Sequence, residues 1–122
     1  MKAIRIDTCG GPEVLRLVEL PEPQPGAGQL RVRVEAAGVN FIDVYMRAGQ
    51  YARSNTYQTP LPMIIGMEGS GLVEALGPGT SGIAVGDHVG YCIVRGSYAE
   101  YAAVPAWKLV KLPGDIPLPI AT

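Results

Sequence analysis

The 122-residue chain contains one histidine and two cysteines, which is few for a metal centre. Cys9 and Cys92 lie far apart in the sequence and fit no C-x-x-C spacing. A tetrahedral zinc site needs three or four nitrogen, sulfur or oxygen ligands. We therefore predict that the chain holds no metal, and that the two cysteines are buried or part-buried thiols rather than a disulfide.

The sequence also lacks a long apolar run and a strong net charge. No apolar segment approaches the roughly 20 residues of a transmembrane helix, and residues 1–6 alternate instead of forming the apolar stretch of a signal peptide. The net charge is −1, and no basic cluster is interleaved with aromatic residues. We expect a cytoplasmic protein with neither a nucleic-acid nor a membrane partner.

Several features that often mark a site lack the surroundings that their chemistry needs. Gly77–Gly82 matches G-x-G-x-x-G, but the segment after it has no helical face whose N-terminus would hold a pyrophosphate. We predict a plain loop there. His88 follows a Gly-Asp turn without an identifiable partner, so we predict a role at the start of a strand. The serines lack a nucleophile-elbow context, which leaves hydrolase chemistry without support.

Alternation of apolar and polar residues is the main structural signal in the chain. Sixteen glycines and eleven prolines fall between the alternating runs, as in turns. The first two runs are predicted to pair as a hairpin, and six or seven short strands favour a closed or partly closed β-barrel. The predicted strands are residues 2–6, 14–20, 30–36, 71–76, 89–94, 98–104 and 109–112, with a further return to strand from Met63.

One segment changes to helical spacing. Residues 40–48 carry apolar side chains at positions 41, 44, 45 and 48. Asn40 suits the N-cap, Asp43 favours the positive end of the helix dipole, and Gly49 suits the exit. The sequence therefore predicts a mainly β fold with one short helix near residues 40–48, followed by a polar loop over 50–62.

The best constellation of polar side chains lies on and beside this helix. Asn40 and Asp43, three residues apart, face each other across the first turn. The phenols of Tyr45 and Tyr51 can donate to a carbonyl while their rings stack on a flat substrate. The same residues also suit purely structural roles, as helix caps and as core side chains with polar tips. On the residues alone, the structural interpretation is favoured.

Glu68 lies between glycines, after the apolar run Met63-Ile-Ile-Gly66. A carboxylate in apolar surroundings needs a hydrogen-bond partner or a raised pKa. Glu68 is then either a structural hydrogen-bond hub in a tight turn or a group that lines a site. The sequence leaves both alternatives open.

Six short motifs occur in one order along essentially the whole chain. They are Gly10-Gly-Pro-Glu-Val-Leu15, Gly38-Val-Asn-Phe-Ile-Asp43, Arg47-Ala-Gly49, Gly66-Met-Glu-Gly69, Gly86-Asp-His-Val89 and Tyr98-Ala-Glu-Tyr101. With these motifs the chain resembles the quinone oxidoreductase branch of the medium-chain dehydrogenase/reductase superfamily, including the zeta-crystallin-like proteins.

The resemblance implies a GroES-like, partly closed barrel over residues 1–122 that acts as a catalytic domain. It implies NADPH-dependent reduction of quinones or enones, with NADP as the cofactor. Asn40 would lie beside the nicotinamide and the substrate, Tyr45, Tyr51 and Glu68 would line the substrate pocket, and Asp43 would support its wall. Zinc-dependent relatives carry Cys where Asn40 stands and His where Met67 stands, so the resemblance also implies a zinc-independent enzyme.

The chain departs from this family in length, because family members continue through a Gly-rich dinucleotide-binding Rossmann domain. We therefore expect a catalytic-domain fragment that is inactive alone and binds NADP weakly. We expect the face around residues 40–51, with the apolar tail 118–120, to self-associate where a Rossmann domain would dock. The alternative is a stand-alone GroES-like barrel that serves as an interaction module without a cofactor.

Overall fold

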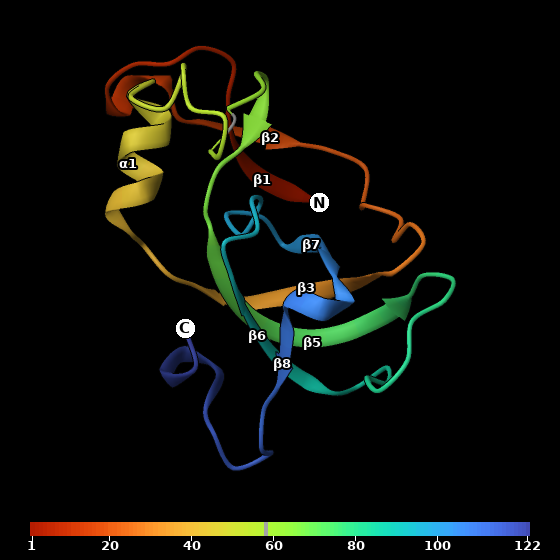
Figure 1. Cartoon of the computed structure of the whole chain (residues 1–122). Helices are drawn as coiled ribbons and strands as arrows, with labels where there is room; N and C mark the ends of the chain where they lie inside the picture. The colour runs from red at the N-terminus through yellow and green to blue at the C-terminus, as the bar shows by residue number, and fades with distance from the viewer. Residues whose placement is uncertain (58) are drawn as a thin grey trace.

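Two antiparallel sheets form the framework of the computed structural model, which describes residues 1–57 and 59–122 (Figure 1). The sheets are not closed into a barrel, so the predicted mainly β, partly closed fold is confirmed. The smaller sheet has the order β2 (Arg16–Glu19), β1 (Lys2–Ile6), β4 (Met63–Ile64). The larger has the order β7 (Tyr101–Pro105), β3 (Gln29–Ala37), β5 (Glu68–Leu76), β6 (His88–Cys92), β8 (Leu109–Lys111).

Alternation along β3 shows how the sequence specifies the larger sheet. Leu30 and Val32 are fully buried on one face. Arg31 and Arg33 point to the other face, where both pair with Glu74 of β5, at 3.8 Å and 2.9 Å respectively. Successive side chains of a strand point to opposite faces, so the period-2 pattern fixes which face meets the core.

The predicted hairpin is confirmed, since β1 and β2 pair antiparallel with Lys2 opposite Glu19. The described chain has eight strands rather than six or seven. The predicted strand from Tyr98 was wrong at its start, because β7 begins only at Tyr101 and Tyr98 is turned toward the helix. The loop at Gly77–Gly82 and the strand start at His88 are both confirmed.

Apolar side chains gather in two clusters. The larger cluster lies on the five-stranded sheet and comprises Leu30, Val32, Val73, Val89, Tyr91, Ala102, Val104 and Leu109. The smaller cluster joins the smaller sheet to the helix and comprises Ile6, Met46, Met63 and Met67, with Tyr51 and Tyr57 packed against it. The helix and the loop after it are therefore fixed by a core separate from that of the larger sheet.

The predicted helix is confirmed as α1 (Phe41–Arg47), with Asn40 as its N-cap. It stands beside the smaller sheet and above the larger one (Figure 1). Gly49 follows it with φ 79°, a left-handed conformation that glycine adopts without strain. Three short 3-10 helices complete the elements: η1 (Pro12–Val14), η2 (Ala106–Lys108) and η3 (Leu118–Ile120).

The C-terminal segment folds back onto the larger sheet. The fully buried Ser70 of β5 donates to the Leu118 carbonyl at 2.7 Å, and its hydroxyl also contacts that of Thr122. Ile120 remains largely exposed. The apolar tail that was expected to take part in self-association is thus anchored to the sheet at Leu118 and Thr122 and exposed at Ile120.

Cys9 and Cys92 are both free, as predicted, but both are exposed, so their expected burial was wrong. Cys92 is the last residue of β6 and Cys9 lies in the loop between β1 and η1, and neither belongs to the two apolar clusters. Within residues 1–57 and 59–122, no helix has the length and apolar character needed to cross a bilayer.

Candidate functional site

A hydrogen-bonded pair, Asn40 and Glu68, lies where α1 begins. The Asn40 side-chain amide donates from Nδ2 to Glu68 Oε2 at 2.8 Å. Gly38 makes this approach possible, because a Cβ there would collide with Glu68 Oε2 and lie 3.2 Å from Asn40 Nδ2. The chain therefore places a carboxylate of β5 against the N-terminus of the helix, across 28 residues of sequence.

Asp43 holds the backbone of Asn40 in place. Its Oδ2 accepts from the Asn40 backbone N–H at 3.0 Å and from the Tyr98 hydroxyl at 3.0 Å. The Asp43 side chain is only 3% exposed. Burial raises the pKa of Tyr98 well above the usual tyrosine range, and the hydrogen bond to Asp43 raises it further. Asp43 thus ties the helix start to the segment before β7.

Glu68 is the first residue of β5 and lies in the sheet opposite Cys92, so its expected place in a tight turn was wrong, and its role in substrate binding stays a prediction. Glu68 accepts a hydrogen bond from Asn40, as a hub would, and it also lines an open hollow. We name this the Asn40 hollow; its volume is about 470 Å³. Its lining residues are Asn40, Phe41, Ile42, Met67, Glu68, Cys92 and Ile93.

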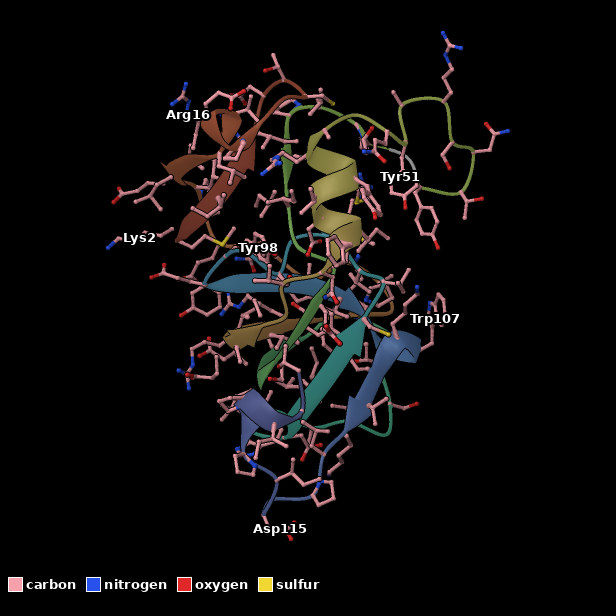
Figure 2. All side chains as sticks on the ribbon, turned by 90° about the vertical axis from the view of Figure 1, so that its left-hand side faces the viewer. Lys2, Arg16, Tyr51, Tyr98, Trp107 and Asp115 are labelled. Carbon is pink, nitrogen blue, oxygen red and sulfur yellow. The ribbon has the colours of Figure 1, made fainter. Side chains whose placement is uncertain are left out.

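A row of four aromatic rings runs from the Asn40 hollow along α1 and into the following loop. The ring of Phe41 stacks on Tyr45 at 6.2 Å, Tyr45 meets Tyr51 edge-on at 6.2 Å, and Tyr51 meets Tyr57 at 5.1 Å. Figure 2 shows Tyr51 in the upper right of the view. Such spacings are favourable for aromatic pairs.

The structure brings Asn40, Asp43 and Glu68 together but places Tyr45 and Tyr51 outside the lining of the Asn40 hollow. Phe41 lines that hollow and stacks on Tyr45, and Tyr45 in turn meets Tyr51. The predicted constellation therefore divides into a hydrogen-bonded group at the helix start and an aromatic row beside it.

A second open hollow, which we name the Lys108 hollow, adjoins the first. Its volume is about 560 Å³. The two hollows share Met67 and Ile93 in their linings. The lining of the Lys108 hollow comprises Met46, Asn55, Thr56, Tyr57, Met67, Ile93, Arg95 and Lys108.

Ile93, on the boundary between the hollows, has an unusual backbone. Its φ is 57°, in the left-handed region that β-branched residues rarely adopt. Its carbonyl accepts a hydrogen bond from Lys108 Nζ at 3.0 Å. Lys108 Nζ also lies 5.0 Å from the centre of the Trp107 ring. Backbone strain of this kind often accompanies a functional site.

Sequence reasoning missed the second hollow entirely. Its residues come from α1, from the loop after it, from the segment between β4 and β5, from the turn after β6 and from η2, and no spacing links these segments. Phe41 was recognised only as an apolar helix position, although its exposure, 77%, is high for such a residue. Tyr51 was predicted as a pocket residue, but its ring contacts with Tyr45 and Tyr57 depend on the fold.

The part of the chain that the structure describes contains no cluster of three or more His, Cys, Asp or Glu side chains suited to a metal ion. Asn40 and Met67, at the two positions that carry zinc ligands in the zinc-dependent relatives, both line the Asn40 hollow. Neither an amide paired with a carboxylate nor a thioether is a typical zinc ligand. Zinc independence stays a prediction for elemental analysis.

Comparison with known proteins gives consistent matches. The quinone oxidoreductase of Lama guanicoe is 41% identical over 118 residues, covering 95% of this chain and 34% of that protein. A 2-haloacrylate reductase of Burkholderia sp is 39% identical over 110 residues, 89% of this chain and 32% of the relative. The Escherichia coli quinone oxidoreductase complexed with NADPH superposes with a TM-score of 0.91 at 34% identity, covering 99% of this chain and 36% of that one.

The chain thus spans about a third of the length of the curated relatives that it matches. Residues 26–114 match the family described as "Alcohol dehydrogenase GroES-like domain". That match includes α1, the Asn40 hollow and β3 to β8. The chain therefore belongs to the alcohol dehydrogenase GroES-like domain family, within the medium-chain dehydrogenase/reductase superfamily.

Proposed function

We propose that this chain is the catalytic-domain part of an NADPH-dependent reductase of quinones or enones. The carrying observation is the Asn40–Glu68 pair, which lines an open hollow beside a row of aromatic rings that begins at the exposed Phe41. Support comes from relatives named quinone oxidoreductase and from a structural neighbour complexed with NADPH. We assign the active site to the Asn40 hollow.

In this proposal the nicotinamide, when bound, would supply a hydride to the substrate. The chain would position the nicotinamide ring and the substrate ring relative to each other. A hollow of about 470 Å³ is within the size of small-molecule sites. Phe41 and Ile93 offer apolar surface for a flat ring. Asn40 offers a side-chain amide held by Glu68, while Asp43 holds the backbone N–H of Asn40. A side chain fixed in this way costs little reorganisation when charge develops on a nearby oxygen.

Tyr45 and Tyr51 act at the entrance in this scheme rather than in the hollow itself. Their rings continue the surface that Phe41 begins, and their hydroxyls can donate to a carbonyl oxygen. Asp43 is a positioning residue, because it contacts the Asn40 backbone and the Tyr98 hydroxyl. We keep quinones and enones together as the substrate class, since one relative is named a 2-haloacrylate reductase.

The residues of this chain fit the nicotinamide end of NADPH but not its diphosphate. The Gly77–Gly82 loop follows β5 and leads to a further turn rather than to a helix N-terminus. We therefore propose that the remaining part of the relatives' length corresponds to the cofactor domain. We also propose that the chain alone is inactive and cytoplasmic. We propose that it self-associates through the face around residues 40–51 together with the apolar tail 118–120. The alternative remains an interaction module without cofactor.

Binding of a flat quinone to the chain tests the assigned site. Anthraquinone-2-sulfonamide is an uncharged probe whose blocked ring does not add to thiols. Added to isotope-labelled protein, it is expected to shift the NMR signals of the Asn40 side-chain amide, Phe41 and Ile93. Asn40→Ala should weaken binding several-fold, whereas Gln24→Ala, at an exposed position on the β2–β3 loop, should leave it unchanged. Shifts confined to other surfaces would refute the assignment.

The fragment interpretation has its own test. With NADPH and the same probe, the chain alone is expected to give no NADPH oxidation above the rate without protein. Calorimetry should give weak NADPH binding, with a dissociation constant beyond about 1 mM, because the charge-assisted bonds to the diphosphate are missing. A micromolar constant would contradict the fragment interpretation and require a cofactor site within these residues.

A further inference from the structure

The Lys108 hollow presents hydrogen-bond donors and positive charge. Four polar side chains line it: Asn55, Thr56, Arg95 and Lys108. Among the described residues, its lining includes two basic side chains and neither Asp nor Glu. The Asn40 hollow has the opposite character, since Glu68 is the single charged side chain in its described lining. Two adjoining hollows therefore differ in the sign of their charge.

Lys108 is held so that its ammonium group faces this hollow. One of its hydrogen-bond donors goes to the Ile93 carbonyl at 3.0 Å, and the ammonium lies over the Trp107 ring at 5.0 Å. A lysine ammonium has three donors. No carboxylate of the described residues lies within ion-pair distance of Lys108. Two of its donors therefore remain for an anion.

The two hollows adjoin at Ile93 and Met67, which line both. A molecule whose ring lies in the Asn40 hollow can extend a substituent across Ile93 into the Lys108 hollow. The carboxylate of Glu68 repels an anion from the first hollow, while Lys108 and Arg95 attract it to the second. Figure 2 shows Trp107, beside Lys108, below Tyr51 along the same side of the molecule.

We infer that the Lys108 hollow binds the anionic substituent of the substrate, and that this chain selects quinones or enones carrying a carboxylate or a similar anion. The inference rests on the proposed function, because it takes the ring to lie in the Asn40 hollow. Charge-assisted hydrogen bonds to Lys108 recognise the substituent, and the neutral donors of Asn55 and Thr56 complete its surroundings. The difference in charge between the hollows fixes which end of the substrate enters which hollow.

A matched pair of probes tests this inference on the whole 122-residue chain. Anthraquinone-2-sulfonate and anthraquinone-2-sulfonamide share the ring and the tetrahedral substituent but differ in charge. Trp107, the single tryptophan, reports binding through quenching of its fluorescence. The sulfonate is expected to bind about fivefold more tightly at low salt, with the preference falling as salt screens it. Its NMR shifts should include Asn55, Thr56 and Ile93.

Three variants separate charge recognition from loss of structure. Lys108→Gln should abolish the preference for the sulfonate while leaving the affinity for the sulfonamide within about twofold. Asn55→Asp places a negative charge in the hollow without touching Lys108 and should reverse the preference. Lys111→Gln removes the same charge at a lysine paired with Asp87, outside both hollows, and should retain the preference.

The outcomes distinguish this inference from the proposed function. Equal binding of the two probes at the Asn40 hollow overturns the anion subsite and leaves the proposed function standing. Binding of neither probe refutes the proposed function, and the subsite fails with it. Inorganic phosphate that shifts the same signals with the affinity of the sulfonate shows a general anion site, which overturns selection of an anionic substrate. Unchanged preference in both Lys108→Gln and Asn55→Asp also overturns it.

Discussion

Ile93 combines an uncommon backbone conformation with a position on the boundary of two hollows. A left-handed conformation in a β-branched residue costs about 1–3 kcal/mol, which the surrounding structure must offset. Its side chain is 46% exposed, so packing recovers only part of that cost. We predict that Ile93→Asn raises the free energy of unfolding by about 1 kcal/mol, because asparagine tolerates the left-handed region.

Urea unfolding measures this change. Val85→Asn is the matched control, since Val85 is an exposed apolar residue in a turn and its φ is not positive. That control should show no gain in stability. A lower free energy of unfolding for Ile93→Asn would show that the side chain stabilises the turn more than its backbone destabilises it.

At the scale of single residues, the sequence predicted contacts between side chains that are close together in the chain. Asn40 and Asp43 lie three positions apart, so helical geometry alone brings them together. Glu68 stayed undecided, because its partner Asn40 is 28 residues away and only pairing of β3 with β5 unites them. The conformation of Ile93 leaves no trace in the sequence, since isoleucine is normally a residue of extended strands.

At the scale of elements, the C-terminal segment depends on a single buried hydroxyl. Ser70 of β5 donates to the Leu118 carbonyl, the first residue of η3. Removing one partner of a buried hydrogen bond costs about 1–3 kcal/mol. We predict that Ser70→Ala lowers the free energy of unfolding by about 1–2 kcal/mol and releases η3 from the sheet.

Hydrogen exchange should detect this release. The amides of Ile120 and Ala121, which donate within η3, are expected to exchange faster in Ser70→Ala while the β5 amides keep their protection. Ser81→Ala, an exposed serine in the loop after β5, should change neither. Uniformly faster exchange across the sheet would instead show that Ser70 stabilises the core and not the segment.

Strands were predictable as elements because each carries its own alternation, whereas their ends and pairing were not. The start of β7 was placed at Tyr98, whose apolar ring continues the pattern of the strand. In the structure its hydroxyl donates to Asp43 of α1, a contact over 55 residues that no local pattern contains. The same limit applies to the Lys108 hollow, which residues of five separate segments line.

At the scale of the whole molecule, the Asn40 hollow lies between the two apolar clusters, where polar side chains join the helix to the larger sheet. The smaller cluster fixes α1, and the larger fixes β5 and β6, which carry Glu68 and Cys92. Between them, the Asp43–Tyr98 and Asn40–Glu68 hydrogen bonds join the helix to the sheet. The Asn40 hollow lies at this junction, so its shape depends on both clusters.

Two tyrosines make this architecture sensitive to alkaline pH. Burial raises the pKa of both Tyr91 and Tyr98 above the usual 10.0. A raised folded-state pKa means that the unfolded chain releases these protons first. Stability is therefore complete below about pH 10, and it falls as the pH rises toward the folded-state pKa. We expect unfolding, followed by circular dichroism, to coincide with ionisation of the last tyrosines, followed by ultraviolet absorbance.

Tyr91→Phe tests whether ionisation of this tyrosine causes the alkaline unfolding. The Tyr91 hydroxyl is buried and, among the described residues, has no hydrogen-bond partner, so phenylalanine keeps the ring packing and removes the ionisable group. The variant is expected to unfold at a higher alkaline pH than the parent chain and to be at least as stable at neutral pH. Tyr101→Phe, at a less buried position of β7, should leave the alkaline transition in place. Ionisation of every tyrosine without any loss of the dichroism signal would show that neither buried hydroxyl is linked to folding, and that alkali leaves the junction between the two clusters intact.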